Sequence, residues 1–207
     1  MTGRPPSLPG AGSRTPATLW GAWERGELTC DGRPQAGLGR AVWLQAGRWY
    51  VDVRGPGGFA SDTCFAGSTK WEAPYLTWAH DVDRMDESGG PDRGHMTFDG
   101  DDLIEQGEFI AGMARSYRER WRRLPGPAAP LLAARAHSGL ALRVGDHAAA
   151  VLDDRESTGA FTARYWRRSG PEWELELAID DGGRASVPEP LDPHAELACG
   201  WRFEEVA

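Results

Sequence analysis

The side chains best suited to acid–base chemistry are concentrated in one block of this 207-residue sequence, between Phe65 and Trp121. The predicted catalytic residues in it are His80, Asp83, Glu105 and Tyr117. An imidazole titrates near neutral pH and can act as a general acid or base. A carboxyl group that faces an apolar lumen has its pKa raised by desolvation, so Glu105 would be able to donate a proton at neutral pH. The hydroxyl groups of Tyr117 and Tyr50 are suited to orienting a carbonyl group.

The partner of His80 is constrained by strand geometry. His80 and Asp81 point to opposite faces of a regular strand, so a carboxylate on the face of His80 is expected from another strand, such as Glu105 or Glu108. A histidine satisfied by a backbone carbonyl beneath a hairpin is the alternative. Glu105 and Glu108 diverge in the same way unless Gly107 forms a bulge.

No metal ion or cofactor is expected from the motifs. The spacing of the histidines and aspartates matches no compact metal site, and no flanking sequence supports a haem-ligand role for His80 or His147. Gly-x-Ser-x-Gly and Walker motifs are absent, which disfavours nucleophilic hydrolysis and phosphoryl transfer. The three cysteines form no Cys-x-x-Cys pair, so a reduced, cytoplasmic location is expected.

Ten tryptophans are unusual for a chain of this length. Large aromatic side chains on short strands suit barrel walls and ligand cavities. In the strand over 48–54, Trp49 lies on one face and Tyr50 and Asp52 on the other, which would be either solvent or a lined interior. The predicted ligand-binding residues are Trp49, Tyr50, Asp52, Phe65, Trp78, Phe109 and Trp121.

The elements that position these residues are predicted to be strands, which makes the chain all-β. Alternating segments are joined by tight turns at Ala46-Gly47 and Asp99-Gly100. The segment 110–124 fits a helical stripe or a strand, and we predict a strand because Gly107 and Gly112 weaken a long helix. The expected organisation is a disordered lead (1–18), a first antiparallel barrel (19–124), a Pro/Gly linker (125–130) and a second, smaller barrel (131–207).

The charge balance limits the partners. There are 23 basic and 31 acidic residues, and the net charge of −8 argues against nucleic acid or an anionic membrane. No apolar run approaches the roughly 20 residues of a membrane span. We expect an apolar small molecule as the partner of a monomer or homodimer.

The order Phe65-Ala66-Gly67, Trp78-x-His80-x-Val82-Asp83, Glu105-x-Gly107 and Tyr117-x-Glu119-x-Trp121 resembles the Hri proteins. These are fungal calycin-like (lipocalin-like) proteins named for an interaction with a casein kinase. The resemblance implies two lipocalin-like antiparallel β-barrels in tandem and few or short helices. It implies no catalytic residues.

Three functions are compatible with these residues. The first is a cofactor-independent barrel enzyme that steers cyclisation or isomerisation of an apolar small molecule, as in natural-product biosynthesis, by positioning and acid–base groups. The second is a module that binds a hydrophobic ligand without chemistry. The third is an interaction protein whose barrels are filled by side chains. The first is preferred because titratable groups in a cavity are more simply explained by chemistry than by storage.

Overall fold

The computed structural model describes residues 14–57, 63–85, 92–110, 113–182, 189–192 and 200–206. Most of the predicted N-terminal lead lies outside these ranges. Its described part packs on the barrel, because Thr15 is buried and its hydroxyl lies 2.7 Å from that of Thr69. A short 3-10 helix, η1 (Ala17–Leu19), leads into the first strand. Within the described ranges no helix has the length and apolar composition needed to cross a membrane.

The first half of the chain is a closed antiparallel barrel of eight strands. Each strand pairs with the next along the chain, and the first also pairs with the last, which closes the barrel. The short β2 (Arg33–Pro34) pairs antiparallel with the last two residues of β1. The barrel strands are β1 (Gly21–Cys30), β3 (Ala41–Ala46), β4 (Trp49–Arg54), β5 (Phe65–Glu72), β6 (Tyr75–Asp83), β7 (Asp92–Asp99), β8 (Asp102–Ile110) and β9 (Met113–Arg123).

Tight turns place these strands next to one another. Gly47 between β3 and β4 has φ 58°, and Gly100 between β7 and β8 has φ 66°. Both values lie in the left-handed region that two-residue hairpin turns require and that glycine adopts without strain. The two predicted hairpins are confirmed, and so is the strand prediction for the ambiguous segment, since β9 occupies Met113–Arg123.

The second half forms a six-stranded antiparallel sheet in the order β14-β13-β12-β11-β10-β15. Among the described residues this sheet is open, so the expected closure into a second barrel is not found there. Its last strand pairs with β10 and not with β14, which leaves β14 at an edge. The strands are β10 (Leu131–Ala136), β11 (Gly139–Val144), β12 (His147–Asp154), β13 (Ala160–Ser169), β14 (Glu172–Asp181) and β15 (Arg202–Glu204).

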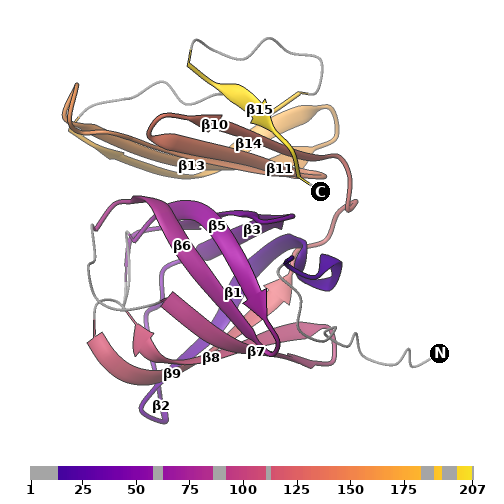
Figure 1. The fold of residues 1–207 in the computed structure, drawn as a ribbon, viewed down its shortest axis with the longest axis vertical. Helices are drawn as coiled ribbons and strands as arrows, with labels where there is room; N and C mark the ends of the chain where they lie inside the picture. The colour runs from indigo at the N-terminus through magenta and orange to yellow at the C-terminus, as the bar shows by residue number, and fades with distance from the viewer. Residues whose placement is uncertain are drawn as a thin grey trace.

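The open sheet lies across one side of the barrel, facing β3, β5 and β6 (Figure 1). One continuous apolar core joins the two halves: Val51 and Val53 of β4 belong to the same buried cluster as Leu140 and Leu142 of β11. The predicted linker 125–130 runs between β9 and β10. A second buried cluster, rich in tryptophan, fills the barrel interior. Both faces of β4 are therefore buried, one against the sheet and one in the barrel.

Candidate functional site

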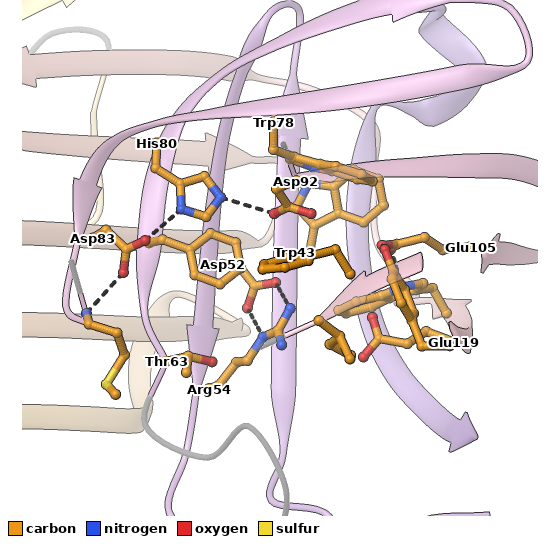
Figure 2. Close-up of a pocket in the computed structure, with 16 residues that line it drawn as sticks. Trp43, Asp52, Arg54, Thr63, Trp78, His80, Asp83, Asp92, Glu105 and Glu119 are labelled. Carbon is orange, nitrogen blue, oxygen red and sulfur yellow. Dashed lines mark hydrogen bonds and ion pairs between the residues drawn. The ribbon is translucent and has the colours of Figure 1, made fainter. Parts of the chain in front are cut away.

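A cavity opens inside the barrel, and Figure 2 shows the side chains that line it. The centre of a water molecule can move through about 90 Å³ of this space. At about 10–15 Å³ for each water, this is room for roughly six to nine water molecules. Nine of the eleven predicted site residues line the cavity: Asp52, Phe65, Trp78, His80, Asp83, Glu105, Phe109, Tyr117 and Trp121.

The apolar part of the wall includes three indole rings in contact with one another, beside Phe65, Met85, Phe109 and Ile110. Trp43 of β3 has its ring centroid 5.8 Å from that of Trp78 and 5.7 Å from that of Trp121, both in edge-on contact. Edge-on aromatic contacts of this kind are stabilising beyond the area they bury. The three rings belong to one buried cluster and hold one another in place. The wall is therefore preformed.

His80 has two carboxylate partners. Its Nδ1 lies 2.6 Å from Asp83 Oδ2, and its Nε2 lies 2.9 Å from Asp92 Oδ2 (Figure 2). Asp92 lies on β7, so the expectation of a carboxylate from another strand is confirmed, but Glu105 and Glu108, the residues suggested for it, are wrong. The second partner, Asp83, comes from the same strand as His80. Glu108 is exposed to solvent, whereas Glu105 bonds to other groups.

A β-bulge explains this difference. Ala66 of β5 pairs with Val82, but the next residue, Gly67, pairs with His80, so Asp81 is an extra residue in β6. A bulge interrupts the alternation of a strand, and His80 and Asp83 then project to the same side. Gly67 is needed opposite the bulge, because a Cβ there would lie 2.0 Å from the carbonyl oxygen of Ala79.

The two carboxylates fix the protonation state of His80. Both ring nitrogens face acceptors, so both must donate, and the ring is an imidazolium. Burial alone lowers the pKa of this imidazole, but the hydrogen bonds and charges of Asp83 and Asp92 outweigh burial and raise the pKa of His80 to about 9. At neutral pH the ring therefore carries both protons. This arrangement disfavours a general-base role for His80.

Glu105 lies deeper in the cavity and is only 6 % exposed. Its carboxyl oxygens accept hydrogen bonds from Tyr117 Oη, at 2.6 Å, and from Trp121 Nε1, at 3.0 Å. Burial and the nearby charges of Glu119 and Asp92 raise the pKa of Glu105 well above its usual range. A carboxyl group of this kind in an apolar lumen is what the sequence predicts for Glu105.

Two glycines make room for this pair. A Cβ at Gly94 would lie 2.7 Å from Glu105 Cγ, and a Cβ at Gly107 would lie 2.4 Å from the Tyr117 ring. Neither position has the backbone conformation that would itself require glycine, so the requirement is one of space. These two positions let a glutamate and a tyrosine reach the same point of the barrel interior.

Further charged groups complete the wall or lie behind it. Arg54 donates two hydrogen bonds to Asp52, of 3.0 and 2.9 Å, and Arg25 Nη1 lies 3.1 Å from Glu119 Oε1. All four side chains are buried. Each buried charge here has a partner of opposite sign, the condition under which such charges are tolerated.

Some residues of the wall were missed by sequence reasoning. Arg54 and Glu119 carried a usable signal, because each alternates with predicted site residues, Asp52 in one strand and Trp121 in the other. Asp92 carried none, because it lies inside the polar, Gly-rich segment 86–94, for which the sequence predicts a turn. That prediction is wrong at its end, since β7 begins at Asp92.

Two predicted ligand-binding residues do not line the cavity. Trp49 packs in the core between barrel and sheet, where its Nε1 donates to the carbonyl oxygen of Glu205. Its predicted contact with a barrel ligand is therefore wrong for this cavity. Tyr50 is fully buried inside the barrel, beside the Phe65 and His80 rings, and supports the wall from behind.

The described residues contain no group of three or more His, Cys, Asp or Glu side chains arranged to hold a metal ion. Both nitrogens of His80 are already engaged by carboxylates. Cys30 and Cys64 are buried free thiols, and Cys199 lies outside the described residues.

A family model described as Protein HRI1 matches residues 38–203, which is most of the sequence. The chain belongs to the HRI1 family. No curated protein and no solved structure matches it.

The residues by which the sequence resembles the HRI1 family coincide with the cavity. Those that line it are Phe65, Trp78, His80, Asp83, Glu105, Tyr117, Glu119 and Trp121. Gly67 and Gly107, from the same motifs, stand where a side chain would clash with the bulge or with Tyr117. In this HRI1 chain the motifs therefore describe one site in the barrel.

Proposed function

We propose that the barrel of this HRI1-family chain binds a small, largely apolar organic molecule in the cavity. The observation that carries this proposal is the composition of the wall: three indole rings in contact, with a few buried polar groups directed at one space. Sites for small molecules in proteins are mostly apolar and carry a few placed polar groups.

The size of the cavity limits the ligand. Space for roughly six to nine water molecules fits a compound of up to about ten non-hydrogen atoms. An eight-stranded barrel that encloses one small ligand is the arrangement of lipocalins. We therefore propose that the eight-stranded barrel of this chain is lipocalin-like.

The test is a thermal-shift and tryptophan-fluorescence screen with compounds of about five to ten non-hydrogen atoms. Ile110 lines the cavity and is 8 % exposed, so Ile110→Trp is designed to fill it. Leu175 on β14, which is 48 % exposed, provides the matched control Leu175→Trp. At least one compound is expected to raise the Tm of the wild type and of the control but not of the filled variant. A screen without hits, or equal responses in all three proteins, would refute the proposal.

A second candidate is cofactor-independent cyclisation or isomerisation of the bound molecule. The observation that favours it is the Glu105–Tyr117 pair, because burial raises the pKa of this carboxyl group well above its usual range and so favours the protonated form, which can deliver a proton to a substrate. His80, fixed between two carboxylates, would position the ligand as a cation and not act as a base.

Metabolite profiles of the native host test this candidate. The gene is deleted and then restored as wild type, as Glu105→Gln or as the exposed control Glu108→Gln. If the barrel is an enzyme, one precursor accumulates in the deletion strain, and only the wild type and the control clear it. An unchanged metabolite profile, or clearance by Glu105→Gln, would contradict catalysis by Glu105.

A further inference from the structure

Every carboxyl group that lines the cavity, with one exception, contacts a cation of the protein. Four of the five carboxyl groups that line it face a cation of the protein at 3.1 Å or less: Asp52 faces Arg54, Glu119 faces Arg25, and Asp83 and Asp92 share His80. Glu105 has no ion-pair partner among the described residues. Its hydrogen-bond donors, Tyr117 and Trp121, are both neutral.

A buried carboxylate without a counter-ion is costly, and proteins normally avoid one. The two cavity-lining cations, Arg54 and His80, are each held by carboxylates of their own, through contacts of 2.6 to 2.9 Å in the ion pairs. Neither forms an ion pair with Glu105, although the charge of Arg54 acts on it from a distance. With Glu105 ionised, the five carboxylates exceed the three protein cations, so the site carries excess negative charge.

The surroundings of Glu105 suit a positive group. One of its own donors is the Trp121 indole, whose ring touches that of Trp43, which in turn touches Trp78. The faces of indole rings attract cations, and tryptophan does so best among the aromatic residues. Figure 2 shows Trp43, Trp78 and Glu105 around the same cavity.

We propose that the ligand of this barrel is a small organic cation, an alkylammonium compound of up to about ten non-hydrogen atoms, with Glu105 as its counter-ion. This inference rests on the proposed binding function and specifies its ligand class. An alkylated ammonium group meets both requirements of the wall, because its methyl or methylene groups are apolar and its charge is positive.

The path into the site is consistent with this ligand. The described residues at the exposed end of the cavity include Met85, which is 49 % exposed, and Asp92, whose side chain is 31 % exposed. Glu105 and Trp121 are buried at the inner end. At this more exposed end, the two negative charges of Asp92 and Asp83 exceed the single positive charge of His80, which favours a cation.

Binding and proton release are then coupled. Burial and the charges of Glu119 and Asp92 keep the pKa of Glu105 high, while the Tyr117 hydrogen bond and the charge of Arg54 act in the opposite direction. A bound cation favours the ionised carboxylate. The affinity for a cation is therefore expected to rise with pH, by up to about tenfold per pH unit while Glu105 is protonated in the free protein. The pKa of His80 is about 9, so this ring stays largely charged at neutral and lower pH and contributes little to the change in affinity there.

Isothermal titration calorimetry with three probes of matched shape tests the inference. Choline is the cation, 3,3-dimethylbutan-1-ol is its neutral isostere, and 3,3-dimethylbutanoate is the anion. The wild type is expected to bind choline at least about tenfold more tightly than the neutral alcohol, and the anion weakest. Glu105→Gln keeps the shape of the side chain and is expected to abolish this preference, whereas the exposed control Glu108→Gln is expected to keep it.

The outcomes separate the two proposals. Binding of the alcohol as tightly as choline would overturn the cation inference and leave the binding function standing. Failure of all three probes at millimolar concentration would overturn the inference, and the compound screen would then decide the binding function alone. If Glu105→Gln does not fold, the wild type is instead titrated with choline in buffers of different ionisation enthalpy. This series measures the number of protons released on binding. Choline binding without proton release would then refute the assignment of Glu105.

Discussion

The continuous core between barrel and sheet predicts that the chain unfolds as one unit. Leu142 of β11 is fully buried in the cluster that also contains Val51 and Val53 of the barrel. Replacing a buried leucine by alanine costs about 2–5 kcal/mol, because the lost apolar contacts leave a cavity. For a chain of this size, a loss of about 3 kcal/mol lowers the Tm by roughly 6–12 °C.

The positions of the tryptophans provide the assay. Seven of the ten precede Leu124 and three follow it, so fluorescence reports mainly on the barrel. Leu142→Ala, although in the sheet, is expected to lower the unfolding midpoint of the barrel fluorescence and of the far-ultraviolet circular dichroism equally. Leu175→Ala, at an exposed position of β14, is the control and is expected to change stability by less than about 0.5 kcal/mol. An unchanged fluorescence midpoint, with an earlier separate transition in circular dichroism, would refute a common folding unit.

Three further predictions concern the barrel interior. Glu119→Gln leaves Arg25 buried without a countercharge and is expected to lower the free energy of unfolding by about 3–5 kcal/mol in urea titrations; a loss below about 1 kcal/mol would contradict the ion pair. The pKa of His80 in the folded protein, about 9, is above the usual value of 6.5, so its contribution to stability is full below pH 6.5 and is lost as pH rises through 9. As pH rises from 6.5 through 9, the urea midpoint of the wild type should therefore fall relative to that of His80→Gln. Urea midpoints that change in parallel with pH in the two proteins would contradict the two carboxylate contacts. Gly107→Ala places a Cβ against the Tyr117 ring and is expected to cost about 1–3 kcal/mol, measured by thermal unfolding; an unchanged Tm would show that the ring moves freely.

The sequence was sufficient to predict the order of the strands and most of the cavity wall. Period-two alternation and glycine turns mark the hairpins, and in β4 alternation separates Tyr50 and Asp52 from Trp49. Alternation alone could not tell which face of β4 looks into the barrel. The sequence predicts Trp49 as a ligand contact, but the open sheet buries its face of β4, so Trp49 belongs to the core between the two halves.

The partner of His80 could not be predicted from strand parity. Parity arguments assume a regular strand, and the extra residue Asp81 breaks that assumption between His80 and Asp83. Closure is likewise a long-range property. The pairing of β1 with β9 closes the barrel, and the pairing of β15 with β10 occupies one edge of the sheet, yet no local signal distinguishes the two cases.

The same bulge has a consequence for the order in which the protein is made. While it turns His80 into the barrel, Asp81 points outward and lies 3.1 Å from Arg135 of β10, a strand that leaves the ribosome after the whole barrel. Until that strand arrives, the nascent barrel exposes Val51 and Val53 to solvent or to chaperones, and Asp81 lacks its cation. The ion pair between Asp81 and Arg135 thus forms late in synthesis, when the second sheet covers the apolar side of the barrel.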